Sequence, residues 1–157
     1  MEKKTLRIDC LEYGGLDELD AAARHLMEMA MAAAHDAYAP YSHFHVGAAV
    51  RLADGTVVTG SNQENVAYPS GLCAERVALF SASAQHPDQP VTALAVVGFQ
   101  NGHYCEASPC GACRQVMAEY EQRYGQKVTV YCYLNEGRIR QITGVESLLP
   151  FGFKARL

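Results

Sequence analysis

A nine-residue apolar run, VTALAVVGF at positions 91–99, constrains the fold of this chain more than any other segment. Near-continuous hydrophobicity with β-branched residues is typical of a central strand that is covered on both faces. Such a strand needs a helical layer on each side of its sheet. The sequence therefore predicts a three-layer α-β-α fold, an α/β class with a mixed five-stranded sheet and flanking helices.

Two further strands and one helix are predicted before this run. An amphipathic helix is predicted to open at Asp17, which with Asp20 three residues on suits an N-terminal cap. The residues at helical spacing in this segment are Leu19, Ala23, Leu26, Ala30 and Ala33. Pro40 disfavours helix at the residue before it, so this helix ends there at the latest. The segment 45–62 has two β-rich runs joined by an Asp-Gly pair at 54–55, which indicates a β-hairpin.

Two more helices are predicted at 73–84 and 108–124. In the first, Val77 and Phe80 are expected to face inward. In the second, Ser108 is expected to cap the N-terminus, Pro109 suits the first turn, and Gly125 suits the end.

Strands are predicted at 127–134 and 138–143, followed by a short helix near 145–150. No internal repeat or low-complexity linker separates these elements. We expect an N-terminal extension, 1–16, and a single catalytic domain, 17–157.

The charge of the chain narrows its partners and location. The formal net charge is −4, and no run of clustered Lys and Arg is present. Phosphate backbones require such clusters, so no nucleic-acid partner is expected. The N-terminus lacks the apolar core of a secretory signal, and the apolar run at 25–35 is too short to span a bilayer. We expect a cytoplasmic protein without a membrane partner, whose six cysteines are thiols or metal ligands rather than disulfides.

Three cysteines are predicted to meet at the starts of two helices. Cys110 and Cys113 are three residues apart and share a helix face, while Cys73 begins the preceding helix. Glu75 is two positions beyond Cys73, so it points elsewhere and is a poor fourth ligand. Three thiolates with an open position are the stoichiometry of a catalytic zinc site, because structural zinc sites close all four positions.

Two other interpretations of these cysteines stay open on spacing alone. A lone C-x-x-C is weak evidence, since buried free cysteines are common. A thioredoxin-like redox pair is also possible, although it is expected directly after an early strand of a βαβ unit. Cys10, Cys105 and Cys132 are predicted to be ordinary thiols.

The motif C-A-E followed by P-C-x-x-C resembles the signature of the zinc nucleoside and nucleobase deaminases. The segments YAPYSHFHVGAAV, GSNQENVAYPSGLCAER, SPCGACRQV and LLPFGF resemble the homotetrameric cytidine deaminases, in the same order and spacing. The similarity extends from about Ala21 to Phe153. Cys at position 73, rather than His, indicates the tetrameric branch.

The resemblance implies a hydrolytic deamination. One Zn²⁺ per chain, held by Cys73, Cys110 and Cys113, activates a water as the hydroxide that attacks C4 of cytidine or 2′-deoxycytidine. Glu75 takes the proton and passes it to N3 and then to the departing ammonia, so that uridine or 2′-deoxyuridine forms. The expected partner is a small pyrimidine nucleoside, and the expected role is pyrimidine salvage.

The resemblance also implies the remaining site residues. Asn62 and Glu64 match the pair that binds the ribose hydroxyls, and alternation would place both on one strand face. The aromatic against the base matches Phe44, and the backbone of Ala74 is expected to meet the base edge. Two further roles are implied: hydrogen bonding of the ligand sulfurs by Arg76, and completion of a neighbouring subunit's site by Phe153 in a homotetramer.

Other functions share parts of this pattern. An aminonucleoside-antibiotic deaminase of the blasticidin type uses the same zinc chemistry, and Asn62 and Glu64, which suit an ordinary ribose, argue against it. A polynucleotide-editing deaminase would need a basic groove. A non-catalytic zinc-stabilised module would have no use for Glu75.

Overall fold

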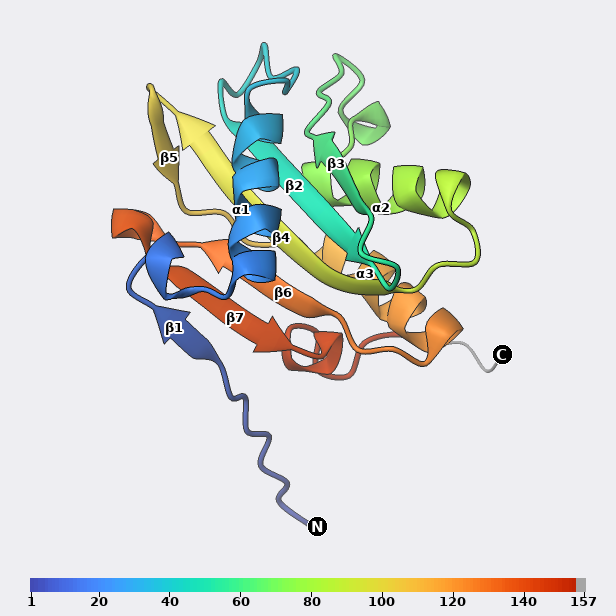
Figure 1. The fold of residues 1–157 in the computed structure, drawn as a ribbon. Helices are drawn as coiled ribbons and strands as arrows, with labels where there is room; N and C mark the ends of the chain where they lie inside the picture. The colour runs from blue at the N-terminus through green and yellow to red at the C-terminus, as the bar shows by residue number, and fades with distance from the viewer. Residues whose placement is uncertain (155–157) are drawn as a thin grey trace.

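The computed structural model describes residues 1–154, so the last three residues of the predicted domain, 155–157, lie outside the described residues. A mixed sheet forms the middle layer (Figure 1). Helix α1 (Ala21–Ala34) covers one face, and α2 (Ala74–Gln85) and α3 (Gly111–Tyr124) cover the other, as the two core clusters show. The predicted three-layer α/β fold is confirmed.

The sheet has seven strands, so the predicted count of five is wrong. Their order is β1-β7-β6-β4-β2-β3, with β5 paired to β4. The two additional strands have three residues each, too few for an alternating pattern to show in the sequence. The strands are β1 (Leu11–Tyr13), β2 (His45–Leu52), β3 (Val57–Ser61), β4 (Val91–Gln100), β5 (His103–Cys105), β6 (Thr129–Tyr133) and β7 (Ile139–Thr143).

Strand β4 is central, as its apolar run predicts. It pairs antiparallel with β2 and parallel with β6, which makes the sheet mixed. Leu94 and Val96 enter the core shared with α2 and α3, whereas Ala95 and Val97 enter the core beneath α1. The β2–β3 hairpin around residues 54–55 is also confirmed.

Helix α1 begins later than predicted. Its N-cap is Asp20, whose side chain accepts a hydrogen bond of 2.8 Å from the amide of Ala23. Asp17 lies in a separate 3₁₀ turn, Leu16–Glu18, so the predicted start at that residue is wrong. The cap that satisfies a helical amide decides the boundary.

Helix α2 is rotated from its predicted orientation. Ala74, Ala78 and Leu79 are buried, whereas Phe80 is 43% exposed and does not face inward. A Cβ atom at Gly60 of β3 would lie 2.4 Å from the amide nitrogen of Ala78. The helix backbone therefore packs directly on this glycine, with Ala74 and Ala78 against the strand and Leu79 in the core beside it.

Helix α3 also begins later than predicted. Its N-cap is Cys110, without a side-chain capping bond, so the predicted capping role of Ser108 is wrong. Gly125 ends the helix with a left-handed φ of 62°, as predicted. The predicted helix after β7 is a 3₁₀ turn, Val145–Ser147.

Part of the segment 1–16 joins the sheet. Glu12 of β1 accepts hydrogen bonds from Arg138 (3.3 Å) and Arg140 (2.6 Å) of the β7 side, which ties this edge strand down. In the described part of the chain, no helix has the length and hydrophobicity needed to cross a membrane.

Candidate active site

The three cysteines of the sequence motif converge where α2 and α3 begin. Cys73 is the N-cap of α2, Cys110 is the N-cap of α3, and Cys113 lies in the first turn of α3. The sulfur of Cys110 is 3.7 Å from that of Cys73 and 3.5 Å from that of Cys113. All three sulfurs lie within 4.8 Å of one another.

These distances fit a tetrahedral zinc site. Zn–S bonds of about 2.3 Å at tetrahedral angles place two sulfurs about 3.8 Å apart. Two of the separations in the cluster are within 0.3 Å of that value. The described residues contribute three such ligands to this cluster, which leaves the fourth tetrahedral position for a substrate or water.

Positive charge and dipoles surround the Cys73 sulfur. Arg76 donates a hydrogen bond from Nη2 to this sulfur at 3.7 Å, and the N-terminus of α2 adds the positive end of its dipole. Hydrogen bonds from Cys113, and then from Arg76, lower the pKa of Cys73 well below that of an ordinary thiol in the metal-free chain. Cys113 supplies the shared proton, so its own pKa is raised by its hydrogen bond to Cys73. Anionic sulfur is the form that binds metal.

Glu75 lies buried beside the cluster. Its exposure is 3%, and desolvation, followed by the nearby Cys73 thiolate, raises the pKa of its carboxyl to about 7. An acid with a pKa near the working pH can both accept and release a proton during a reaction. The helix whose N-cap is Cys73 therefore also places a carboxyl that can accept and release a proton beside the cluster.

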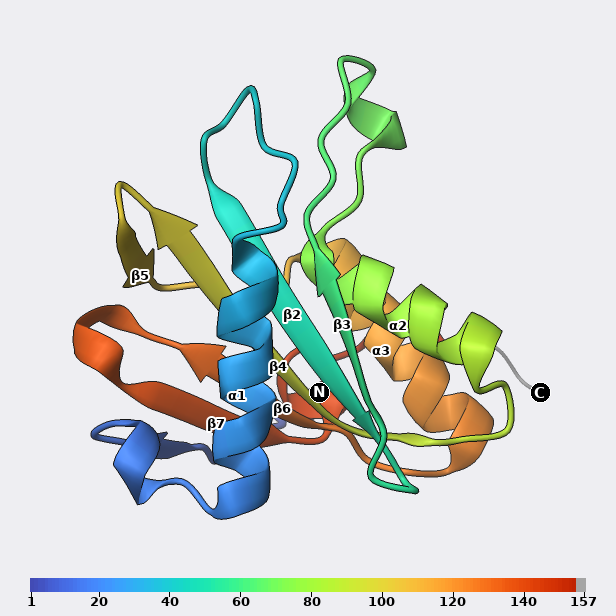
Figure 2. The same cartoon turned by 45° about the horizontal axis from the view of Figure 1, so that its top comes forward.

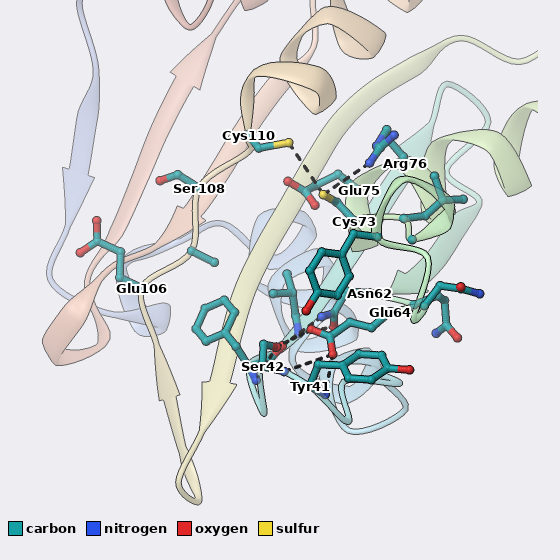
Figure 3. Close-up of a pocket in the computed structure, with 18 residues that line it drawn as sticks. Tyr41, Ser42, Asn62, Glu64, Cys73, Glu75, Arg76, Glu106, Ser108 and Cys110 are labelled. Atoms are coloured by element: carbon teal, nitrogen blue, oxygen red, sulfur yellow. Dashed lines mark hydrogen bonds between the residues drawn. The ribbon is translucent and has the colours of Figure 1, made fainter.

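A pocket of about 770 Å³ opens over the cluster (Figure 3). Its walls come from the segments 41–46, 62–76 and 106–110, which belong to loops and helix starts at one end of the sheet. Phe44, Asn62 and Glu64 line it together with Cys73, Cys110, Glu75 and Arg76. Ala74 is fully buried at the first position of α2, and Phe153 is 80% exposed and does not line the pocket of its own chain.

Asn62 and Glu64 lie after the end of β3, so the predicted shared strand face is wrong. The strand ends at Ser61, so Asn62 and Glu64 are oriented by individual side-chain hydrogen bonds and not by strand alternation. The side chain of Asn62 accepts from the amide of Val46 (2.7 Å) and donates to the carbonyl of Phe44 (2.9 Å).

Glu64 is hydrogen-bonded to the neighbouring loop that precedes β2. Its carboxylate accepts from the amides of Tyr41 (2.9 Å) and Ser42 (3.2 Å) and from the Ser42 hydroxyl. These hydrogen bonds lower the pKa of Glu64, which keeps it anionic. These hydrogen bonds join the loop before β2 to the loop after β3, and both loops line the pocket.

Several pocket residues are not among the predicted site residues, although Tyr41, Ser42 and Tyr68 lie within the segments that resemble the cytidine deaminases. Tyr41, Ser42, Tyr68 and Glu106 line the cavity, but no spacing or periodicity separates them from ordinary loop residues. Only the turn-forming Pro residues beside Tyr41 and Tyr68 mark these segments as loops. The other three cysteines, Cys10, Cys105 and Cys132, are free thiols outside the cluster.

The comparison with protein families agrees with this geometry. Residues 21–131 match the family model described as the cytidine and deoxycytidylate deaminase zinc-binding region. The chain belongs to the cytidine and deoxycytidylate deaminase family. The matched region is a zinc-binding one and includes Cys110 and Cys113, which favours the metal-ligand interpretation of this pair over the thioredoxin-like one.

Individual deaminases are similar over most of the chain. The cytidine deaminase of Halalkalibacterium halodurans is 44% identical over 130 residues, which cover 83% of this chain and 92% of that protein. The crystal structure of cytidine deaminase from Burkholderia pseudomallei matches with a TM-score of 0.71 at 44% identity, over 82% of this chain and 97% of that one. The Mycobacterium tuberculosis cytidine deaminase structure matches with a TM-score of 0.68 at 34% identity, over 88% of this chain and all of that one.

Zinc content tests the ligand set of this deaminase. We expect one zinc per chain, and its loss in Cys110→Ala, because two thiolates bind the ion far more weakly than three. Elemental analysis of purified protein gives the ratio. The control is Cys10→Ala, which removes an exposed thiol outside the cluster and should keep the metal. Full zinc in Cys110→Ala would contradict the assignment.

The pH dependence of stability tests the buried carboxyl. Because the pKa of Glu75 is raised in the folded chain, its contribution to stability is present below about pH 4.5 and is lost as the pH rises through about 7. In metal-free, reduced protein, we expect the free energy of unfolding of the wild type to fall relative to Glu75→Gln by up to about 3 kcal/mol between pH 5 and 8.

Urea titrations of the two metal-free proteins measure this difference. Cys73, whose lowered pKa acts in the opposite direction, is present in both and largely cancels. Parallel stability curves for the two proteins would show that Glu75 titrates normally.

Proposed function

We propose that this protein deaminates cytidine and 2′-deoxycytidine to uridine and 2′-deoxyuridine, with release of ammonia, as a step of pyrimidine salvage in the cytoplasm. The observation that carries the proposal is a three-thiol cluster with one open position, beside a buried carboxyl with a pKa near 7. Both lie at a pocket whose volume is in the usual range for small-molecule sites. The family assignment supports the same chemistry.

Glu75 moves the protons of the reaction. Zinc, when bound by Cys73, Cys110 and Cys113, lowers the pKa of a water in its open position to about 7. Glu75 takes the proton of the attacking water and delivers it to N3 of the pyrimidine. Glu75 then takes the proton of the hydroxyl group added at C4 and delivers it to the amino group, which leaves C4 as ammonia while the C4 carbonyl of uridine forms. Burial of Glu75 favours both steps, because it excludes bulk water that would compete for the proton.

Arg76 and the helix starts balance the charge of the thiolates. Three thiolates and Zn²⁺ leave a formal charge of −1, which weakens a Lewis acid. The hydrogen bond from Arg76 to the Cys73 sulfur and the N-termini of α2 and α3 withdraw electron density from the sulfurs. We therefore assign Arg76 a positioning and charge-balancing role.

The nucleoside is held by residues around the pocket. Phe44 lies against the base, and the backbone of Ala74 meets the base edge. After its bonds to Phe44 and Val46, the amide of Asn62 keeps one N–H free, and the carboxylate of Glu64 keeps a lone pair after its three bonds. A ribose 3′-hydroxyl can accept a hydrogen bond from this N–H of Asn62 and donate one to the carboxylate of Glu64. Cytidine and 2′-deoxycytidine both carry that hydroxyl.

The charges around the pocket favour a free nucleoside over a polynucleotide. Among the residues that line it, Glu64, Glu75 and Glu106 are acidic, and the lining has one strongly basic side chain, Arg76. The guanidinium of Arg76 donates to the Cys73 sulfur, so the one strongly basic side chain of the lining is directed at the cysteine cluster.

We also propose a homotetramer in which Phe153 of one subunit completes the pocket of a neighbour. In a single chain, Phe151 is 93% exposed and Phe153 is 80% exposed. Gln115 donates a hydrogen bond of 2.8 Å to the carbonyl of Phe153, which fixes this part of the tail while the ring stays in water. Burying a ring of this size contributes about 1.5–3 kcal/mol, so an intersubunit contact is favoured.

Replacement of the proton carrier tests the mechanism. Glu75→Gln retains hydrogen bonding but cannot carry a proton, so we expect turnover of cytidine to fall by at least about 10²–10⁴-fold. Zinc content and the circular dichroism spectrum should match the wild type. The loss of absorbance as cytidine becomes uridine gives the rate. Near wild-type turnover would contradict the mechanism.

Light scattering tests the assembly. We expect a mass about four times the 17.1 kDa of one chain. Deleting residues 150–157 should lower the mass and raise the KM for cytidine together, because the same segment serves both purposes. Leu6→Ser, at an exposed apolar position near the other end of the chain, is the control. It should change neither the mass nor the KM. An active monomer would contradict the proposal.

A further inference from the structure

Gly98, near the end of β4, leaves a gap that two side chains fill. A Cβ atom at this position would lie 2.8 Å from Cζ of Phe44 and 2.9 Å from Sγ of Cys105. Both distances are shorter than real Cβ contacts, so the Phe44 ring and the Cys105 thiol occupy space that any other residue would fill. Cys105 lies opposite Gly98 in the β4–β5 pairing.

The gap faces the side of the sheet that carries the pocket. Leu94 and Val96 enter the core shared with α2 and α3, and strand alternation places position 98 on the same face. Phe44 also lines the pocket, so its ring lies between the β4 backbone and the cavity. The depth of the gap therefore sets how far the ring extends into the cavity.

The backbone of Phe44 is held independently of its ring. Its amide donates to the Ser42 hydroxyl at 3.1 Å, and its carbonyl accepts from Asn62 at 2.9 Å. The preceding residue, His43, has a φ of 55°, a left-handed conformation that side-chain-bearing residues rarely adopt. A change beneath the ring must therefore be absorbed by its side-chain torsions rather than by the loop.

We propose that Gly98 is a positioning residue for substrate binding: the absence of its side chain seats the Phe44 ring at the depth that leaves room for the pyrimidine. This inference rests on the proposed function, in which Phe44 contacts the base. Gly98 differs from Gly60, where a Cβ atom would meet the helix backbone. At Gly98 the nearest atoms are the ends of movable side chains, so the fold can accept a methyl group while the ring cannot keep its place.

Gly98→Ala tests the proposal through the separation of KM from kcat. We expect the KM for cytidine to rise about tenfold, the order of effect of one methylene group in a hydrophobic substrate pocket, while kcat changes much less. Zinc content should remain at the wild-type level. Gly14→Ala is the matched control, because its Cβ would lie 2.9 Å from the Glu18 carboxylate, a clash of the same kind with another movable side-chain end. This control should leave KM unchanged.

A double-mutant cycle shows whether Gly98 acts through Phe44. In the Phe44→Ala background the ring is gone, so Gly98→Ala should raise KM no further. An additional tenfold rise in that background, or an equal loss of kcat and zinc, would overturn the proposal. Failure of Gly98→Ala alone to fold, with a folded double variant, would also overturn it by showing a packing role. A wild-type protein that does not deaminate cytidine would instead refute the proposed function.

Discussion

The packing of α2 on β3 fixes the position of the chemistry in this protein. Gly60 lets the helix backbone approach the strand, since a Cβ atom there would lie 2.4 Å from the amide nitrogen of Ala78. The start of α2 is thereby brought to the end of the sheet where α3 also begins, as Figure 2 shows for the two helices on one face. Cys73 and Cys110 are the N-caps of these two helices, so the backbone contact at Gly60 helps to place the Cys73 side of the cluster.

The same arrangement resolves the electrostatic conflict of the site. Clustered thiolates and a buried carboxyl repel one another, and each would be unfavourable alone. Helix N-termini and Arg76 stabilise the thiolate of Cys73, whereas burial keeps the pKa of Glu75 near 7. The pKa values of Cys73 and Glu75, two residues apart at the start of α2, are thus shifted in opposite directions. A thiolate that is able to bind metal and a carboxyl that is able to exchange a proton therefore lie side by side.

Hydrophobicity, turn residues and cysteine spacing in the sequence predicted the fold and the three-cysteine cluster. The features that the sequence could not predict depend on contacts between particular residues. The buried β4, the β2–β3 hairpin and the three cysteines follow from hydrophobicity, turn residues and helical spacing. Strands β1 and β5 are too short to carry a pattern. Phe80 faces outward because α2 packs on Gly60 of β3 through the side that carries Ala74 and Ala78. The N-cap of α3 is Cys110, which has no side-chain capping bond that its residue type would predict. The orientation of Asn62 depends on a hydrogen bond from the amide of Val46 in β2, 16 residues away in sequence.

X-ray absorption at the zinc edge tests the central claim, that two helix starts build an open metal site, most directly. For the zinc-loaded wild type, the account predicts three sulfur scatterers at about 2.3 Å and one oxygen or nitrogen at about 2.0 Å. This result would place the cluster of Cys73, Cys110 and Cys113 around a metal that still has a position for water. Four sulfur scatterers, which would close the site, or a shell of oxygen and nitrogen alone, would contradict it.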